Sequence, residues 1–180
     1  RRTLPKAAGY HRAQRCGVEV PGVHPACHLD DARRRDTGEY VDTTGGWHDA
    51  GDLRKWMGAT LMNGIGLLRM ARHLGERWDP AGSGLAPIHE EVRWGNRYFL
   101  KMQDADGLVF NDVGGGVNGD NSDNHWTDNR RGTPDDRYLN PAKGGVNQAL
   151  FIAFEAMMAR AFEKVDPEYA RTCLDAALRC

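Results

Sequence analysis

Apolar residues recur at spacings of three and four over residues 53–74, the longest helix-like pattern in this 180-residue chain. That spacing predicts an amphipathic helix, and Gly75 would end it. Shorter patterns of the same kind predict further helices over residues 4–15, 87–103, 145–164 and 166–180. Strand signals are limited to residues 108–110, so the chain is predicted to have an all-α fold.

The predicted helices carry residues whose environment can be anticipated. Glycine inside a helix costs roughly 1 kcal/mol relative to alanine, so a compensating close contact with a neighbouring helix is expected. In residues 53–74 this expectation applies to Gly58, Gly64 and Gly66. In the helix predicted over residues 145–164, the apolar face is expected to consist of Val146, Ala149, Leu150, Ala153, Met157, Met158 and Phe162.

Charge and hydropathy exclude some classes of partner. Lys and Arg number 24 and Asp and Glu 25, so no uniform basic field favours nucleic acid. No run of 18 apolar residues predicts a membrane span, and the Arg-rich start lacks the apolar segment of a secretory signal. The chain begins without Met and stops at Cys180 within a helical pattern, which favours an internal fragment of a longer protein.

A polar loop containing Gly45-Gly46-Trp47-His48-Asp49-Ala50-Gly51-Asp52 leads into the helix predicted over residues 53–74. At a helix start, the carboxylates of Asp49 and Asp52 would lie on one side, about 5–6 Å apart at Cβ, and could share one water. The positive end of the helix would keep them anionic, which favours a proton-accepting site. The alternative is that they are only an N-cap and a first-turn acid.

Four residues in the two loops before that helix have side chains suited to zinc: Cys16, Cys27, His28 and His48. Two thiolates and two imidazoles are typical of a closed, structural zinc site. Their spacing matches no short zinc-finger motif, and a disulfide between Cys16 and Cys27, or two unrelated buried thiols, remain alternatives. A metal that fixed His48 would also fix the backbone of Asp49.

The octapeptide at residues 45–52 resembles the signature G-G-W-[YH]-D-A-G-D of glycoside hydrolase family 9, the inverting cellulases and their relatives. Residues 14–17 (QRCG) and 26–28 (ACH) resemble the entry to the catalytic domain in the zinc-containing members. Residues 98–103 (YFLKMQ) resemble the end of the family's third helix. Residues 119–126 resemble its substrate loop, so the resemblance covers most of the chain.

The resemblance assigns roles to particular residues. Asp52 would be the general base that takes a proton from the attacking water, and Asp49 would hold the same water. Cys16, Cys27, His28 and His48 would bind a structural Zn²⁺. The residues that contact sugar would be His125, Trp126 and Trp47. Calcium sites occur in the family, but none can be assigned to residues of this chain.

The resemblance also implies an (α/α)₆ barrel of the six-hairpin glycosidase type. Residues 1–180 would be the N-terminal portion of its catalytic domain, truncated before the glutamate that acts as general acid. Glu90, Glu91 and Glu155 lie within predicted helices and are expected on solvated faces. Two departures leave the glucan preference open: Leu53-Arg54-Lys55-Trp56 differs from the usual residues after the signature, and His125 directly precedes Trp126.

The function expected from the resemblance is hydrolysis of O-glycosidic bonds in β-linked glucans of the cellulose type, with inversion. Mixed-linkage glucan, xyloglucan or a glucosamine oligomer are alternative substrates, and a zinc-stabilised glycan-binding module without hydrolysis is the alternative function. The isolated fragment is expected to be inactive and the full-length protein monomeric. Its partner would be a polysaccharide or oligosaccharide, not nucleic acid or a membrane. Secretion or a periplasmic location is inferred from that substrate alone.

Overall fold

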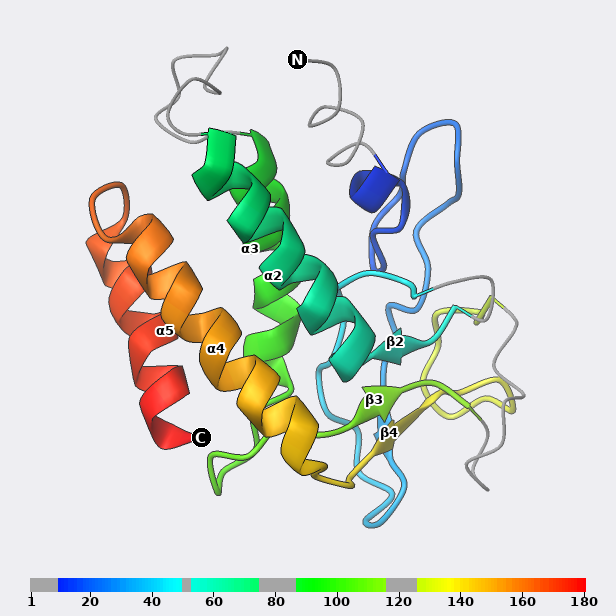
Figure 1. Cartoon of the computed structure of the whole chain (residues 1–180). Coiled ribbons are helices and arrows are strands. Elements are labelled where there is room, and N and C mark those ends of the chain that lie inside the picture. The colour runs from blue at the N-terminus through cyan, green and yellow to red at the C-terminus, as the bar shows by residue number, and fades with distance from the viewer. Residues whose placement is uncertain (1–9, 50–52, 75–86, 116–125) are drawn as a thin grey trace.

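The computed structural model describes residues 10–49, 53–74, 87–115 and 126–180. In this part of the chain, four long helices lie on one side and a small sheet with long loops lies on the other (Figure 1). The helices are α2 (Met57–Leu74), α3 (Pro87–Lys101), α4 (Gly145–Phe162) and α5 (Pro167–Arg179). α2 packs against α3 and α4, and α4 packs against α5. None of the described helices is long and apolar enough to cross a membrane.

A small sheet makes the strictly all-α prediction wrong. Its strands in the described residues are β1 (Arg33–Arg34), β2 (Lys55–Trp56), β3 (Asp112–Val113) and β4 (Tyr138–Asn140). Their order is β1-β4-β3-β2, with β1 parallel to β4 and the other pairs antiparallel. Strands of two or three residues are too short for the alternation of apolar and polar residues that identifies a strand in a sequence. The sheet joins four loop segments that are far apart in the chain.

The first residues of the predicted central helix are not helical. α2 begins at Met57, while Lys55 and Trp56 pair with β3, and Leu53 has a left-handed backbone with φ of 57°. The first turn of α2 carries no acidic residue. The expectation that Asp49 lies at a helix N-terminus is therefore wrong, and the dipole of α2 does not account for its charge. Asp52 lies outside the described residues.

The predicted close packing of glycines on α2 is confirmed at two of three positions. A Cβ at Gly64 would lie 2.6 Å from Cε2 of Phe154, and one at Gly58 would lie 2.9 Å from Oδ1 of Asn147. Both contacts are with α4, so the absence of side chains lets the two helices approach closely. The prediction is wrong for Gly66, where a Cβ would meet nothing within 4 Å.

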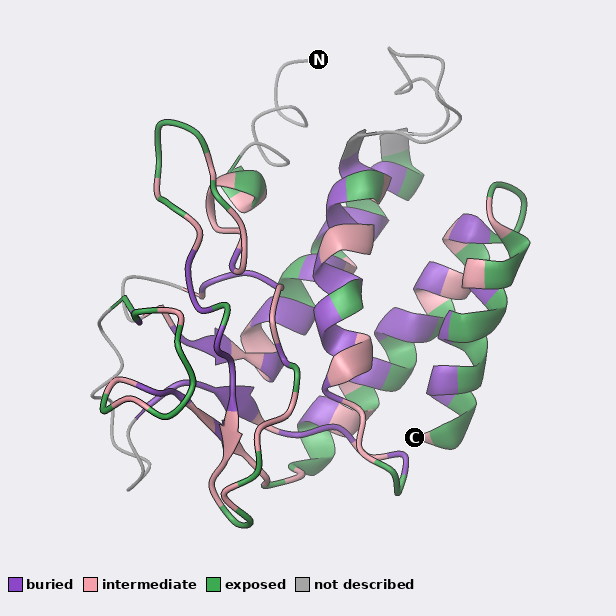
Figure 2. Cartoon of the chain, turned by 180° about the vertical axis from the view of Figure 1, so that it is seen from behind, coloured by how far each residue is buried: buried purple, intermediate pink, exposed green. Residues whose placement is uncertain are grey.

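The prediction for the buried face of α4 is confirmed in part: Met158 and Phe162 are buried, and Leu150 and Met157 are partly buried against the core. It is wrong for Val146, which is 74% exposed, and for Ala149 and Ala153, which are exposed as well. The buried residues of α4 are Asn147, Phe151, Phe154, Glu155, Met158 and Phe162. The helix is apolar nearly all round, so its sequence does not specify one face, and contacts with other elements decide which side is buried. Figure 2 shows the resulting exposed strip on α4 and α5 beside buried residues of the same helices.

Two helical glutamates that were expected on solvated faces are buried. Glu91 on α3 and Glu155 on α4 are both 0% exposed, whereas Glu90 is exposed as predicted. The prediction failed because helical position alone does not reveal a polar partner that comes from elsewhere in the chain. Both carboxyl groups have such partners.

Candidate metal centre and acid loop

Backbone hydrogen bonds hold together the three loop segments that carry the predicted metal ligands. Arg15 and Trp47 form an isolated antiparallel bridge. Beside it, the N–H of Cys16 donates to the carbonyl of Gly46 (2.9 Å), and the N–H of Gly17 donates to the carbonyl of Cys27 (3.1 Å). Residues 14–17, 27–28 and 46–48 are therefore joined without a continuous strand.

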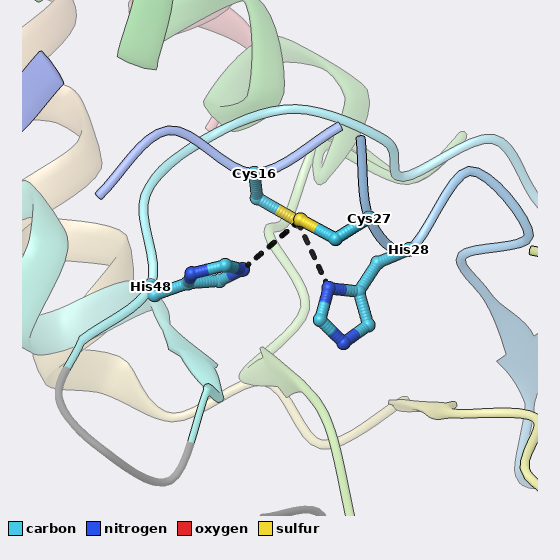
Figure 3. Close-up of side chains that lie close together, drawn as sticks. All are labelled: Cys16, Cys27, His28 and His48. Atoms are coloured by element: carbon cyan, nitrogen blue, oxygen red, sulfur yellow. Dashed lines mark hydrogen bonds between the residues drawn. The ribbon is translucent and has the colours of Figure 1, made fainter. Parts of the chain in front are cut away.

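The side chains of Cys16, Cys27, His28 and His48 converge from these segments and are all buried (Figure 3). Their four possible ligand atoms lie within 4.8 Å of one another. Sγ of Cys16 is 3.8 Å from Nδ1 of His28, and Sγ of Cys27 is 3.7 Å from Nε2 of His48. Sulfur and nitrogen ligands of one tetrahedral zinc ion would be about 3.6 Å apart. The predicted group is therefore brought together, and it has the composition and spacing to hold a metal.

The protonation of the cluster favours metal binding. The hydrogen bond with Cys16 lowers the pKa of Cys27 to about 7, and burial lowers the pKa of His48. A thiolate and a neutral imidazole are the forms that coordinate metal ions. Cys16 and Cys27 are free thiols, so the structure does not contain the alternative disulfide between them.

A buried ion network lies directly behind the cluster. The carboxylate of Asp31 accepts two hydrogen bonds from Arg137, from Nε (2.9 Å) and Nη2 (2.5 Å), and pairs with Nζ of Lys55 at 2.6 Å. Burial by itself would raise the pKa of Asp31, but the positive charges of Arg137 and Lys55 lower it well below its ordinary value. Nη2 of Arg137 is also 4.0 Å from Sγ of Cys16, so the network reaches the metal ligands.

Two hydrogen bonds hold the base of the acid loop, residues 49–54, and one of them comes from the ion network. The N–H of Asp49 donates to the carbonyl of Arg54 (2.9 Å), which closes the base of the loop. Nη1 of Arg137 donates to the carbonyl of Leu53 (2.6 Å). Asp49 is half-buried, and Asp52 lies outside the described residues. The loop base is therefore linked through Arg137 to the metal cluster.

Residues after position 125 pack on the loop that carries two of the ligands. The ring of Trp126 lies 5.8 Å from that of His28 and 5.7 Å from that of His48, and this tryptophan remains 49% exposed. Thr127 Oγ1 donates to Asp30 Oδ1 at 2.6 Å, which holds the two segments together. His125, the other predicted sugar contact, lies outside the described residues.

Trp47, the third predicted sugar contact, is part of the core. It is 1% exposed, and its indole lies against α3, where a Cβ at Gly95 would be only 2.0 Å from Cη2 of Trp47. Its Nε1 donates to Oε1 of Glu91 at 2.9 Å. An indole enclosed in this way has no free face for a sugar, so Trp47 contributes to packing.

The sequence interpretation missed Asp31, Lys55, Glu91 and Arg137. Asp31 follows His28 closely, and this proximity of an acid to a ligand is the one signal that could have raised attention. Its partner Arg137 is 106 residues away, and no local pattern relates the two.

The chain resembles known proteins over its whole length. The sequence profile of glycosyl hydrolase family 9 matches residues 1–180. Endoglucanase D of Acetivibrio thermocellus is 29% identical in an alignment of 191 positions, gaps included, that covers 91% of this chain and 28% of that protein. The crystal structure of a metagenome-derived glycoside hydrolase family 9 endoglucanase superposes with a TM-score of 0.81 at 28% identity, covering 98% of this chain and 34% of that one.

A second similar solved structure is that of a Zn-binding triple mutant of the family 9 endoglucanase J30. It is 30% identical, with a TM-score of 0.77, and the match covers 98% of this chain and 36% of that one. This chain thus spans between 28% and 36% of the length of these three relatives.

Proposed function

This chain belongs to glycosyl hydrolase family 9, and on that premise we propose that the protein containing it hydrolyses β-1,4-linked glucan of the cellulose type with inversion at the anomeric carbon. The observation that carries the proposal is the family match over residues 1–180. Similar proteins named endoglucanase D and cellulose 1,4-beta-cellobiosidase support this choice of substrate. Residues 1–180 would be the N-terminal portion of an (α/α)₆ barrel, to which α2–α5 contribute helices.

The proposed chemistry places the acid loop beside the bond that is cleaved. Asp52 accepts a proton from a water held by Asp49, while the water oxygen attacks the anomeric carbon. The bond from that carbon to the leaving oxygen breaks on the opposite face, so the product has inverted configuration. The hydrogen bond from the N–H of Asp49 to the carbonyl of Arg54, and that from Arg137 to the carbonyl of Leu53, support this role because they hold the base of the loop.

A second carboxyl group must protonate the leaving oxygen, about 6.5–9.5 Å from the base. Glu91 and Glu155 are fully buried and hydrogen-bonded within the fold, so neither is available to a sugar in this arrangement. We propose that the general acid is a glutamate from outside residues 1–180, which agrees with the proposal that these residues are the N-terminal portion of the catalytic domain.

A structural Zn²⁺ would be held by Cys16, Cys27, His28 and His48. When bound, the ion would cross-link the three loop segments through these four ligands. Their convergence, burial and spacing support this proposal. Arg137 would link the position of the acid loop to that of the cluster, because it contacts both Cys16 and the carbonyl of Leu53. The role proposed for the metal is to fix loop geometry, with proton transfer left to the carboxylates.

The half-exposed ring of Trp126 and the adjacent His125 are proposed to contact the glucan, by stacking and by hydrogen bonding to hydroxyl groups. Because cellulose lies outside cells, we further propose that the protein is secreted or periplasmic. It would act as a monomer.

The test uses the longest natural protein that contains this chain, incubated with a soluble β-1,4-glucan. New reducing ends are measured, and NMR spectroscopy identifies the first anomer released. Asp52→Asn should lower the rate by at least about 100-fold, since a positioned general base contributes 10²–10⁴-fold. Asp36→Asn, at an exposed position paired with Arg34, is the matched control and should leave the rate unchanged.

Product of retained configuration, or a rate that does not depend on Asp52, would overturn the proposal. Binding of the glucan without any turnover would instead favour a zinc-stabilised glycan-binding module.

A further inference from the structure

Glu91 connects α3 to two residues that directly precede metal ligands. Its carboxylate accepts hydrogen bonds from Nε (3.2 Å) and Nη2 (2.7 Å) of Arg15, the neighbour of Cys16. It also accepts one from Nε1 of Trp47, the neighbour of His48, at 2.9 Å. A single buried carboxylate therefore holds the segment of one thiol ligand and the segment of one imidazole ligand.

The backbone links the contacts of Glu91 to the positions of two side chains in the cluster. Arg15 and Trp47 are partners in an antiparallel bridge. The side chains of Arg15 and Trp47 both reach Glu91 on α3. Those of Cys16 and His48, one position further on, meet in the cluster instead. Because each pair of neighbours shares a backbone, fixing the side chains of Arg15 and Trp47 restricts the directions of Cys16 and His48.

Other contacts on α3 strengthen the same attachment. The guanidinium carbon of Arg15 lies 4.5 Å from the ring centroid of Trp94, and Nε1 of Trp94 donates to the carbonyl of Gly46 at 3.4 Å. Gly95 leaves the space that the indole of Trp47 occupies. Three residues on one face of α3, Glu91, Trp94 and Gly95, therefore contact the bridge and the residue beside it.

We propose that Glu91 is a positioning residue for the metal cluster: it sets the separation and direction of Cys16 and His48 by holding Arg15 and Trp47. This inference rests on the proposed zinc site. Bidentate hydrogen bonds between a guanidinium and a carboxylate are strong and directional, and here the carboxylate is fully buried while the guanidinium is partly buried. Outer partners of this kind orient metal ligands and typically affect metal affinity by 10- to 100-fold.

The experiment measures zinc affinity of the full chain by competition with a chelator of known affinity. Glu91→Gln keeps the size of the side chain but removes its charge and one acceptor, and should weaken zinc binding by about 10- to 100-fold. Trp47→Phe removes the indole donor and part of the buried ring but keeps both hydrogen bonds from Arg15, so a smaller loss of zinc affinity is expected. The two changes together should cost less than the sum of their separate effects, because both act through the same carboxylate.

Glu155→Gln is the matched control, because Glu155 is an equally buried glutamate on the neighbouring helix α4 and is hydrogen-bonded to Asn96. It should leave zinc affinity unchanged within about two-fold, even where it alters thermal stability. Co²⁺ can replace Zn²⁺ to report ligand geometry by its visible absorption. Glu91→Gln should shift that spectrum, whereas Glu155→Gln should not.

The outcomes separate this inference from the zinc proposal. If the wild-type chain takes up no zinc, the metal proposal fails and the role of Glu91 fails with it. If wild type binds zinc but affinity and Co²⁺ spectrum are unchanged in Glu91→Gln and Trp47→Phe, the role of Glu91 alone is overturned. Should Glu91→Gln not fold, Trp47→Phe decides, because it retains an aromatic ring in the pocket beside Gly95.

Discussion

Glu91 and Glu155 are two fully buried glutamates on neighbouring helices, and they lie in opposite kinds of environment. The carboxylate of Glu91 faces the ligand-bearing loops, where Arg15 supplies a positive charge and two hydrogen bonds. Glu155 faces the helical layer, where Asn96 donates one hydrogen bond of 3.2 Å to Oε2. Its Oε1 has no hydrogen-bond partner among the described residues. Burial raises the pKa of Glu155 to about 8, so this side chain is mostly neutral at pH 7.

The comparison shows how two regions of one molecule are stabilised by different means. The loops offer little apolar surface, and buried charges hold them: Glu91 with Arg15, and Asp31 with Arg137 and Lys55. The helices bury aromatic and aliphatic side chains, and the ring of Phe99 on α3 packs edge-on against Phe154 on α4. Buried ion pairs repay their desolvation only with good geometry, so they fix direction more than they add stability. Direction is what converging metal ligands need.

The largest expected effect comes from breaking the charge pairing of the loops. Asp31→Asn should lower the free energy of unfolding by about 3–5 kcal/mol, because Arg137 and Lys55 would keep buried charges without their carboxylate. The measurement is urea unfolding at pH 7, with Asp36→Asn as the exposed control, for which a loss of at most about 1 kcal/mol is expected. A loss from Asp31→Asn as small as the control's would mean that the loops do not depend on paired charge.

The pKa of Asp31 adds a pH dependence to this prediction. Because the folded state lowers this pKa, the pairing contributes its full stability above the pKa of the unfolded chain, about 3.9. The contribution is lost as pH falls below that value. Asp31→Asn should therefore flatten the dependence of stability on pH at the acidic end, relative to wild type.

The helical layer should respond in the opposite sense when its buried glutamate is replaced. The pKa of Glu155 is raised by burial, so the folded protein binds a proton that the unfolded chain releases above about pH 4.3. Stability then falls as pH rises toward 8, by at most about 1.4 kcal/mol per pH unit. Glu155→Gln should remove this slope and, relative to wild type, gain about 2 kcal/mol between pH 5 and pH 7.

Thermal unfolding of Glu155→Gln and wild type across pH 5–8 tests that prediction. Parallel curves for the two proteins would show that Glu155 is charged in the folded state. The contrast between the two regions would then disappear.

What the sequence could predict follows the same division. Positions of helices are set by local spacing, and α3, α4 and α5 lie within a few residues of the predicted ranges. The four metal-type residues were also recognisable, because cysteine and histidine are uncommon and their chemistry is specific. The roles of Asp49 and Asp52 in catalysis remain predictions.

The remainder depends on contacts between distant segments. The sequence placed a helix over Lys55, yet this residue pairs with β3 and with the carboxylate of Asp31. Glu91 reads as one more solvated helical acid until Arg15, 76 residues earlier, is brought against it. Such pairings have no local sequence pattern, because each charged residue, taken alone, is of a type that is common on protein surfaces.

The smallest expected effect concerns how closely the helices are packed, which depends on the volume of the side chains between them. Gly64 and Gly66 both lie within α2, and alanine should improve the helix by about 1 kcal/mol at either position. At Gly66 nothing stands within 4 Å, so Gly66→Ala should raise the free energy of unfolding by that amount. At Gly64 the new methyl group would meet the ring of Phe154 at 2.6 Å, and overpacking costs about 1–3 kcal/mol.

Gly64→Ala should therefore be less stable than Gly66→Ala by about 1–3 kcal/mol in urea unfolding, while zinc affinity stays at the wild-type value in both. Equal stabilities would mean that α2 and α4 can separate slightly at no cost, and that the helical layer is not closely packed there. A change in zinc affinity in Gly64→Ala would show that packing of α2 against α4 also sets the direction of the metal ligands. The proposal for Glu91 instead assigns that role to contacts between the loops and α3.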